Sequence, residues 1–576
     1  MSVVAEPSAG PARRRPREPI ASGIRARLRL PADMLWHQLW YDLRKPLFGS
    51  WLYRLALPNR VAAGPTPVPL ADSWPGDAAR GAAISQGICA FGGQTIRDPA
   101  PLWAPVGAHL SWLEELHGFD WLRDLRAANG EAGRRVAREL VNRWIDDYRD
   151  WDPLAWRPDL IGRRLAAWVS HAEFLGVAGD ALFRGRFLLS IACQARHLAG
   201  ALPAGLSGSP LLTAIAGLMH AGLALPRGAG YVARGGRMLE QEFVRQFLLD
   251  GGHRERCPSG LFATLRLLTS LRSALTVAEQ PLPNGLDETI RGITQILRLL
   301  QHGDGRLALF NDSNEEEDWL VDMALARANG KAMPLKEAPD SGFERLVANR
   351  TLVLVDSGAP PAAGFDRHAH AGALSFEMSV GRERLIVNCG AHKGRGDWWQ
   401  AQRSTAAHST LVVDDTNSSV FSADSGLVRG PRAVTCRRDE ADGNIWLELS
   451  HDGYGQTFDL IHRRRLFLSA GGDDLRGEDR LIGSGRRLFA IRFHLHPDVT
   501  ASLSQSGQTA LLRLGSGAGW RLRATGGNVT LSDSVYLGRR GEIRKTQQVV
   551  VAGDKRDEEA VVKWAIARES RPVKRT

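Results

Sequence analysis

The chain has 576 residues, of which 43% are hydrophobic and 24% are charged, a composition that excludes a mostly disordered protein and fits roughly two to four domains. Lys and Arg total 74 against 63 Asp and Glu, which gives a net charge of +11. Residues 1–30 carry +5 of this charge, from seven arginines and two glutamates. The remaining 546 residues carry only +6, too little to indicate nucleic-acid binding.

The cysteines and the apolar stretches exclude further classes of protein. Five cysteines, at positions 89, 193, 257, 389 and 436, form no CxxC pair, so neither a disulfide framework nor a cysteine zinc cluster is expected. The longest apolar stretches, such as 211–225, are shorter than the roughly 20 residues that a membrane-spanning helix needs. No apolar segment follows the first basic residues, so the sequence does not show the pattern of a signal peptide. We expect a cytoplasmic protein, with the periplasm or the cell envelope as the alternative.

Helical periodicity dominates residues 32–335, which follow a basic arm at 1–31 that we expect to be disordered. Within 137–148, for example, apolar residues recur at spacings of three and four. Further helical segments are expected near 159–175, 181–200, 209–224, 235–249, 260–277 and 286–302. Consecutive helices with no strands between them indicate a ring in which neighbours bury each other's apolar faces.

In residues 345–565 the apolar residues recur at every second position instead of every third or fourth. Within 374–380, apolar residues alternate with Ser375, Glu377 and Ser379, a pattern typical of a half-buried strand. Other strand-like runs lie at 351–355, 384–387, 410–413, 445–449, 464–469, 489–495, 510–513 and 547–552. Many short strands with almost no helix indicate an antiparallel β-sandwich. We expect a linker at 336–344 and a basic tail at 566–576.

Several histidines and one tyrosine are the candidate catalytic or metal-binding residues. His368 and His370 precede an expected strand and point the same way in extended backbone, so both could converge on one ligand or metal. His408 enters another strand, and His253 follows a pair of glycines that closes a helix. Tyr454 ends a His-Asp-Gly-Tyr segment in the sandwich half.

Each of these residues also has a purely structural interpretation. His253 could cap a helix C-terminus, where a histidine interacts favourably with the helix dipole. Histidines on strands are often hydrogen-bonded supports. His494 and His496 have the same spacing as His368 and His370, so this spacing by itself does not indicate a functional site. The run of arginines at 463–465 fits a solvated face with one arginine reaching inward. Most of the 17 tryptophans fit core positions better than sugar platforms. The sequence contains no GxSxG, P-loop or HExxH motif, and no GxG pair sits in a dinucleotide-binding context.

Several motifs, in order along the chain, resemble the heparinase II/III family. They are His368-Ala-His370-Ala-Gly372, Asn388-Cys-Gly390, Ala407-His408-Ser-Thr410 and His451-Asp-Gly-Tyr454 in the second half, with Asp250-Gly-Gly-His253, His302-Gly-Asp-Gly305 and Phe310-Asn311 upstream. The resemblance covers about residues 34–565. It implies an N-terminal (α/α) toroid followed by a C-terminal antiparallel β-sandwich, in agreement with the periodicities.

The resemblance also implies polysaccharide lyase chemistry on uronate-containing chains. In this β-elimination a base removes the C5 proton, an acid assists departure of the C4 oxygen, and donors neutralise the uronate carboxylate. We therefore assign candidate catalytic roles to His253, His368 and Tyr454, with Arg256 neutralising the carboxylate. Tyr454 could instead be a packed sandwich residue that donates to backbone. The further candidate substrate-binding residues are Trp398, Trp399 and Arg403.

The chain departs from the family pattern at several of its functional positions. Ser209-Pro210 stands where the family's helical half has an Asn-His pair, and no tyrosine lies between Tyr231 and Tyr454. Some family members bind zinc in the sandwich, and the matching positions here are His370 and His408. Asn388 takes the place of the family's carboxylate ligand, and neutral Asn is a poor zinc ligand. A structural zinc ion is the candidate cofactor; without it, the two histidines would be hydrogen-bonded supports.

Two main functional hypotheses remain open at this point. One is a lyase-like protein that acts by β-elimination on a uronate-containing polysaccharide. The other is a non-catalytic glycan-binding or envelope and exopolysaccharide assembly protein that retains the lyase fold; an enzyme acting on a different glycan is a third option. The expected partners are an acidic polysaccharide and, through self-association, a second copy in a homodimer. No nucleic acid and no transmembrane segment are expected.

Overall fold

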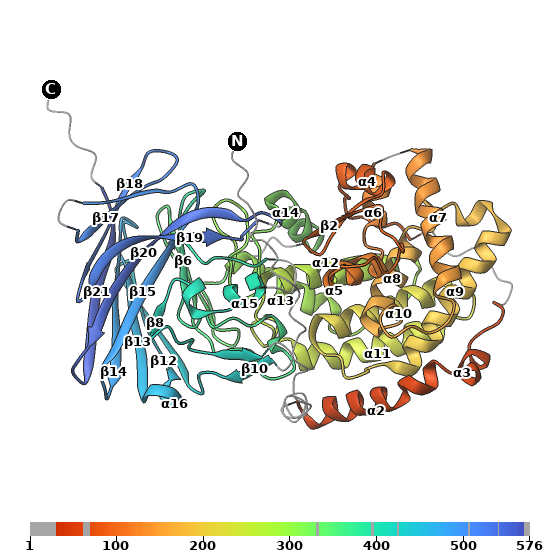
Figure 1. Ribbon diagram of the computed structural model, residues 1–576, viewed down its shortest axis with the longest axis horizontal. Helices are drawn as coiled ribbons and strands as arrows, with labels where there is room; N and C mark the ends of the chain where they lie inside the picture. Colours follow the sequence, from red (N-terminus) through yellow and green to blue (C-terminus); the bar gives the residue numbers. More distant parts are fainter. Residues whose placement is uncertain are drawn as a thin grey trace.

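A computed structural model shows the chain as a helical body followed by a β-sheet body (Figure 1). It describes residues 30–61, 70–128, 130–329, 333–392, 397–422, 426–504, 507–539 and 541–569. The expected arm at 1–31 therefore lies outside the described residues except for its last two positions. This arrangement confirms the expected fold class, an N-terminal helical toroid followed by an antiparallel β-sandwich.

The helical body contains most of the chain's helices. They are α2 (Ala32–Phe48), α3 (Trp51–Ala56), α4 (Ala78–Ser85), α5 (Leu110–Gly118), α6 (Leu122–Ala127), α7 (Glu131–Asp147), α8 (Pro158–Ser170), α9 (Ala181–Ala201), α10 (Gly208–Ala224), α11 (Ala229–Gln246), α12 (Pro258–Val277), α13 (Leu286–Leu299) and α14 (Asp318–Arg327). The expectation of helices without intervening strands is wrong at one place, where β1 (Ile88–Phe91) and β2 (Gln94–Arg97) form a short antiparallel hairpin.

Small residues let the central helices approach closely. A Cβ on Gly217 of α10 would lie 2.2 Å from the carbonyl oxygen of Gly162 on α8, and a Cβ on Gly162 would lie 2.5 Å from the Cα of Ala214. Neither glycine needs an unusual backbone conformation, so close approach is the reason for both. The tryptophans Trp112, Trp144 and Trp168 are fully buried in the core around these helices.

The second body consists of two antiparallel sheets packed face to face. The first has the order β11-β12-β13-β14-β21-β18-β17-β16, and the second has the order β19-β20-β15-β7-β6-β5-β4-β3, with β8 also pairing with β15. Between the sheets, the rings of Phe376 and Trp564 stack at 5.5 Å. Trp564 lies directly over Gly477 of the neighbouring strand, where a Cβ would clash with the indole at 2.0 Å.

The strands are longer and more numerous than the sequence pattern predicts. They are β3 (Glu337–Ala338), β4 (Phe343–Ala348), β5 (Thr351–Asp356), β6 (Phe376–Val380), β7 (Glu383–Val387), β8 (Leu411–Val413), β9 (Val420–Ser422), β10 (Gly426–Arg429), β11 (Val434–Ala441), β12 (Asn444–Tyr454), β13 (Leu460–Leu468), β14 (Asp474–Gly483), β15 (Arg487–Leu495), β16 (Thr500–Leu503), β17 (Thr509–Arg513), β18 (Gly519–Thr525), β19 (Asn528–Tyr536), β20 (Arg544–Lys555) and β21 (Glu559–Arg568). Two short helices, α15 (Asp397–Gln402) and α16 (Gly455–Phe458), interrupt them. The expected linker at 336–344 already contains β3 and the start of β4, and the expected tail from 566 begins inside β21.

The polar face of β6 does not contact solvent, which corrects the expectation of a half-buried strand. All five residues of β6 are buried because the helical body covers the polar face. His302 shares hydrogen bonds with the Glu377 carboxylate at 2.9 Å, through Nε2, and with the Ser379 hydroxyl at 2.9 Å, through Nδ1. The alternation of apolar and polar residues therefore marks an interface between the two bodies.

Other residues of the family motifs lie on the same interface. Arg384 of β7 donates through Nε to Asp304 at 2.8 Å, and Asn311 donates to the Arg256 carbonyl oxygen at 2.6 Å. The Asn311 side-chain oxygen also accepts the backbone N–H of His370 at 3.0 Å. These contacts fix the two bodies relative to each other, so the cleft between them has a defined shape.

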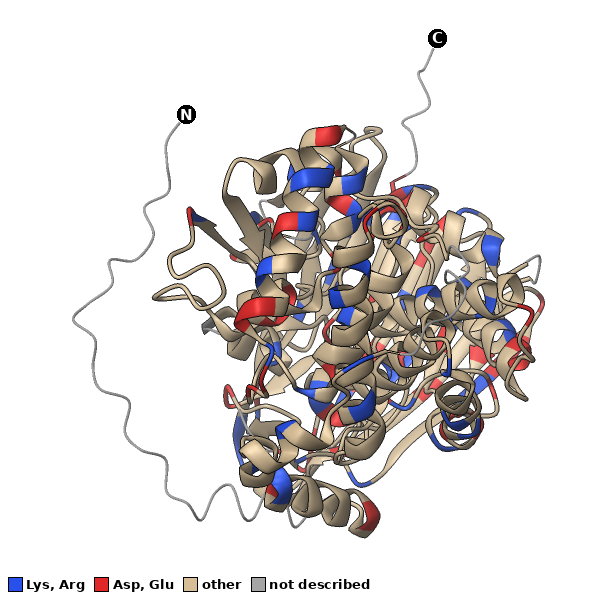
Figure 2. Cartoon of the chain, turned by 90° about the vertical axis from the view of Figure 1, so that its right-hand side faces the viewer, with Lys and Arg blue, Asp and Glu red and all other residues tan. Residues whose placement is uncertain are grey.

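Acidic and basic residues are interspersed along the ribbon of the helical body (Figure 2). No part of the ribbon in this view carries a large region of a single sign. Within the described residues, none of the helices combines the length and the apolar character needed to cross a membrane.

Candidate functional site

A cleft with a volume of about 870 Å³ opens in the helical body and reaches the β-sheet body. Its helical wall includes Arg163 of α8, His220 of α10 and Arg266 of α12. The other wall includes His368 and Trp399, from segments of the sandwich half. A cleft between two packed bodies is a usual place for a ligand site.

Most arginines of the helical wall are paired with carboxylates of the same wall. Arg163 donates through Nε to Asp120 at 2.8 Å. Arg123 lies 3.1 Å from an Asp72 oxygen, and Arg80 forms ion pairs with Glu115 and Asp124. Although burial raises the pKa of Asp120, Arg163 and Arg123 outweigh it and lower the pKa below its ordinary value. These pairs neutralise much of the positive charge that a polyanion would require.

His368 and Asp312 form a hydrogen-bonded pair at the cleft. The His368 Nδ1 lies 2.8 Å from Asp312 Oδ2, and 28% of the His368 side chain is exposed. Burial raises the pKa of Asp312, but the hydrogen bond and charge of His368 lower it overall, so the carboxylate stays ionised. In the neutral form of the ring, Nδ1 donates its proton to the ionised Asp312, which leaves Nε2 with the lone pair of a general base. The backbone N–H of Asp312 donates to the His368 carbonyl oxygen at 3.1 Å and fixes the pair.

His253 lies behind the cleft wall and is buried. Its Nδ1 accepts the backbone N–H of Glu255 at 3.1 Å, and its Nε2 therefore donates to the Gln246 side-chain oxygen at 2.8 Å. Burial lowers its pKa, so the ring is neutral. Glu255 accepts from the Ser209 hydroxyl at 2.5 Å, which accounts for the serine at the position of the family's Asn-His pair. The loop thus holds His253 as an internal support, so the structure does not place it for the catalytic role predicted from the sequence.

Arg256 connects the two bodies and does not line the cleft. It lies in the left-handed region with a φ of +51°, and its guanidinium donates to the carbonyl oxygens of Ser341, Gly342 and Ala359 at 2.6–2.9 Å. It also pairs with Asp356 at 2.5 Å. Because these groups occupy the guanidinium, the structure does not place it to neutralise a substrate carboxylate.

Tyr454 is fully buried in the sandwich and does not converge with His253 and His368. Its hydroxyl donates to the Leu411 carbonyl oxygen at 2.9 Å, and burial raises its pKa well above the ordinary value of 10. The preceding His451 belongs to a buried chain of hydrogen bonds: it lies 3.2 Å from His462, which contacts Asp479 at 2.7 Å. The structure therefore supports the packed-residue interpretation of Tyr454.

The segment around α15 gives a mixed outcome. Trp399 lines the cleft, whereas Trp398 is 40% exposed and lies outside the cleft lining. Arg403 is buried, donates to the Ala369 carbonyl oxygen at 2.9 Å and stacks over the Trp399 ring at 4.4 Å. Of these three residues, Trp399 is placed to contact a ligand directly, and Arg403 supports it from behind.

The residues at the expected zinc position do not fit a zinc ion. The rings of His370 and His408 lie 5.4 Å apart, and His370 Nε2 is a buried nitrogen without a hydrogen-bond partner. The Asn388 side chain is hydrogen-bonded within the protein and does not serve as a metal ligand: its oxygen accepts the Ser409 N–H at 3.0 Å and its nitrogen donates to Glu377 at 3.2 Å. Among the described residues, no group of three or more His, Cys, Asp or Glu side chains is arranged to hold a metal. Zinc sites need three or four protein ligands, so we derive no role for a metal here.

Sequence reasoning missed most of the cleft. Asp312 directly follows the Phe-Asn pair that the motif series includes, so its place in the sequence was a usable signal. The Arg–Asp pairs of the helical wall come from segments 43 to 51 residues apart and follow no spacing rule. Only the ring of helices brings them together.

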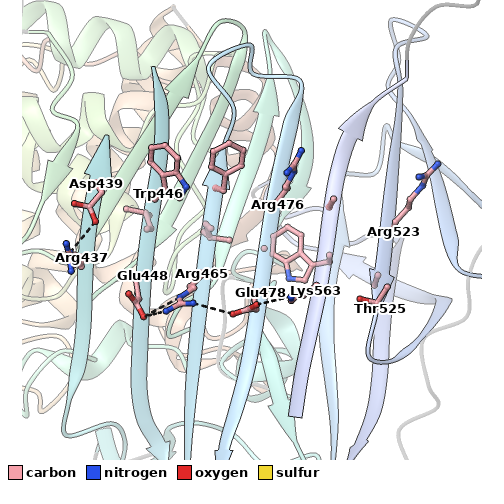
Figure 3. A pocket seen from close by; sticks show the side chains of 17 residues that line it. Arg437, Asp439, Trp446, Glu448, Arg465, Arg476, Glu478, Arg523, Thr525 and Lys563 are labelled. Atoms are coloured by element: carbon pink, nitrogen blue, oxygen red, sulfur yellow. Dashed lines mark hydrogen bonds and ion pairs between the residues drawn. The ribbon is translucent and has the colours of Figure 1, made fainter. Parts of the chain in front are cut away.

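A second concave surface lies on the outer face of the sheet that contains β11–β14 (Figure 3). It also has a volume of about 870 Å³ and carries the exposed ring of Trp446. Its charged residues pair with one another, as Arg465 does with Glu448 at 3.0 Å and Arg437 with Asp439 at 3.2 Å. These contacts are typical of a solvated sheet face, so the cleft remains the candidate site.

Comparisons with known proteins agree with this architecture. The fold is similar to that of solved polysaccharide lyases: a crystal structure of heparinase III (TM-score 0.66, 17% identity, 81% of this chain and 79% of that chain) and a heparan sulfate lyase mutant from Pedobacter heparinus (TM-score 0.61, 16% identity, 96% and 91%). A chondroitin AC lyase of Streptomyces coelicolor A3 in complex with chondroitin sulphate is also similar (TM-score 0.54, 13% identity, 92% and 83%). The chain thus has the toroid-plus-sandwich fold of polysaccharide lyases.

Sequence comparison identifies the family. Residues 330–565 match the family model described as heparinase II/III-like, C-terminal. FtsZ-localized protein C of Caulobacter vibrioides (strain NA1000 / CB15N) is 30% identical over 96% of this chain and 99% of that protein. The chain belongs to the heparinase II/III family, as its motifs predict.

Proposed function

We propose that this chain is a glycan-binding protein that retains the polysaccharide-lyase fold and, like its relative in Caulobacter, localises with FtsZ. The observation that carries the glycan-binding part is the pairing of the cleft arginines with carboxylates. Arg163 is committed to Asp120, and Arg123 to Asp72. A cleft of this kind offers hydrogen-bond donors and acceptors to hydroxyl and amide groups but little net charge to a polyuronate.

The positions of the tyrosines support the same conclusion. All six tyrosines of the chain are among the described residues, and none of them lines the cleft. The phenol that the family resemblance assigns as base or acid is therefore absent from the cleft wall. Trp399, at the cleft, supplies an aromatic face of the kind on which pyranose rings stack.

Glycan binding is tested by comparing neutral and uronate polysaccharides. We expect the full chain to bind a neutral N-acetylated glycan, measured by isothermal titration calorimetry, with little dependence on salt. Trp399→Ala should weaken binding at least about tenfold, while Trp398→Ala, one residue away and outside the cleft lining, should leave it unchanged. Stronger binding to a uronate polysaccharide that falls steeply with salt would contradict the proposal.

The FtsZ part rests on the relative and has its own experiment. We expect the purified chain to co-sediment with FtsZ polymerised by GTP and to stay in the supernatant with unpolymerised FtsZ. Equal sedimentation with and without FtsZ would contradict this part and would leave the glycan part standing.

A second candidate function is β-elimination on a uronate polysaccharide, and the His368–Asp312 pair favours it. His368 Nε2 would take the C5 proton, the C4–O bond would break, a C4–C5 double bond would form, and the leaving oxygen would receive a proton from His368 or water. The assay is a panel of uronate polysaccharides followed by ultraviolet absorbance of the unsaturated product. His368→Ala should abolish any absorbance increase, whereas His392→Ala, a second histidine at the cleft, should retain it. No increase with the unaltered chain excludes this candidate.

A further inference from the structure

The helical wall of the cleft contains two histidines whose ring protons are fixed by the helices that carry them. The Nδ1 of His171, directly after α8, lies 2.8 Å from the Ala167 carbonyl oxygen. The Nδ1 of His220 on α10 lies 2.8 Å from the Ala216 carbonyl oxygen. A carbonyl oxygen only accepts, so Nδ1 is the donor in both rings. Burial lowers the pKa of both histidines, to about 4 for His171, so both rings are neutral and each Nε2 carries a lone pair.

Asp72 lies beside these histidines and adds a third acceptor to the cleft lining. Its Oδ1 accepts the Trp74 backbone N–H at 3.0 Å, and its Oδ2 lies 3.7 Å from the Nε2 of His171. Although burial raises the pKa of Asp72, the charge of Arg123 outweighs it and lowers the pKa below its ordinary value, so the carboxylate is ionised. The same carboxylate opposes the effect of burial on the pKa of His220. The three side chains therefore belong to one part of the cleft wall.

Two of these acceptors are buried atoms to which the fold supplies no donor. Within the described part of the chain, Asp72 Oδ2 and His171 Nε2 have no hydrogen-bond partner, and only 6% and 1% of their side chains are exposed. The Nε of Arg123 lies 3.1 Å from this Asp72 oxygen without the geometry of a hydrogen bond. The carboxylate and the neutral ring cannot bond to each other, because neither has a proton there. Buried acceptors without a donor cost free energy of folding, so this arrangement is typical of a site that a ligand completes.

The charge of the cleft favours a cation over an anion. Among the described residues that line it, five arginines face six carboxylates, a formal net charge of −1. The charge of Arg123 acts on the pKa of three of these carboxylates, Asp72, Asp120 and Asp124. One guanidinium is thus shared among three acidic groups, and the wall keeps negative charge beside the acceptor lone pairs.

We propose that Asp72, His171 and His220 form a subsite for the free amino group of an amino sugar, an inference that rests on the proposed glycan binding and names its ligand class. A protonated amino group donates three hydrogens and carries a positive charge, whereas a sugar hydroxyl or an acetylated amide donates one hydrogen. The carboxylate complements the charge, and the two Nε2 lone pairs accept N–H groups. Small side chains of the same wall, such as Ala166 and Thr213, leave space for the sugar ring within the cleft volume of about 870 Å³.

The test compares two hexasaccharides that differ only in acetylation, one of glucosamine and one of N-acetylglucosamine. Isothermal titration calorimetry of the full chain at pH 6.5 gives both dissociation constants. We expect the glucosamine hexamer to bind at least about tenfold more tightly. Asp72→Asn removes the charge and keeps the size of the side chain, so the two constants should then agree within about threefold, while the N-acetylated hexamer binds as before. His220→Phe keeps a ring without the lone pair and should lower the preference at least about threefold.

A matched control separates the subsite from a general effect of charge. Asp146 of α7 lies outside the cleft lining and its side chain is 65% exposed, so Asp146→Asn should keep the full preference. Circular dichroism checks that the variants are folded, and His220→Phe decides if Asp72→Asn does not fold. Equal binding of the two hexamers overturns this inference and leaves the proposed function standing, whereas binding of neither hexamer contradicts both. An equal loss of preference in Asp72→Asn and Asp146→Asn also overturns the subsite.

Discussion

Removing the Arg256 guanidinium tests whether this residue is the structural connection between the two bodies. Arg256→Met keeps most of the side-chain stem but leaves Asp356 without its ion pair. The side chains of this pair are only 7% and 6% exposed, so solvent does not replace the lost partner. Burial already raises the pKa of Asp356 against the opposing effect of Arg256, and loss of the arginine should raise it further.

Breaking a buried ion pair from one side costs about 3–5 kcal/mol. If the helical body of about 300 residues unfolds as a unit, its unfolding entropy near 60 °C converts this cost into a fall in midpoint of roughly 5–8 °C. Differential scanning calorimetry of the full chain measures it. Arg486→Met is the matched control, because Arg486 pairs with Asp554 but is 70% exposed, and we expect it to shift the midpoint far less than Arg256→Met does.

The double variant Arg256→Met with Asp356→Asn sharpens the experiment. It removes the stranded carboxylate, so part of the lost stability should return. A single variant that unfolds within about 1 °C of the unaltered chain would refute the assignment, given the conversion above. A double variant that is less stable than the single one would show that the buried carboxylate is not the source of the cost.

Three further predictions concern titration, Tyr454 and metal. Burial lowers the pKa of five histidines to about 3–4, so as the pH falls these residues bind protons in the unfolded chain before they do so in the folded chain. The stability they contribute should be full above pH 6.5 and should fall by about 1 kcal/mol per histidine between pH 6.5 and 5.5. Urea midpoints measured across this range test the prediction, and midpoints that do not change with pH would contradict it. The five are His117, His171, His197, His408 and His494. Tyr454→Phe removes the hydroxyl that donates to the Leu411 carbonyl oxygen, so the free energy of unfolding in denaturant titrations should fall by about 1–2 kcal/mol while glycan binding stays unchanged. If the variant instead loses glycan binding and keeps its full stability, Tyr454 has a functional role. Treatment with a chelator should leave the unfolding midpoint unchanged, because the His370 and His408 position lacks a third ligand, and a fall in the midpoint with release of stoichiometric zinc would show otherwise.

The sequence by itself determined the order of the elements and the family. Periodicity of three and four placed the main helices within a few residues of their observed bounds, and period-two runs placed β5, β7, β15 and β20. Strands such as β11 and β14 were missed because most of their side chains are polar or charged. In such strands the backbone ladder and the neighbouring strands decide the conformation, and the hydrophobic pattern carries little signal.

Only the tertiary structure decided which polar residues face the cleft. The sequence singled out His253, Arg256 and Tyr454 by residue type, and folding used all three internally, through Gln246, Asp356 and Leu411. His368 and Trp399 kept a place at the cleft because the interface between the two bodies leaves them partly uncovered. A histidine, an arginine or a tyrosine has the same donors and acceptors in either role. Whether those groups serve the fold or a ligand depends on which distant segments pack against them, and local sequence does not contain that information.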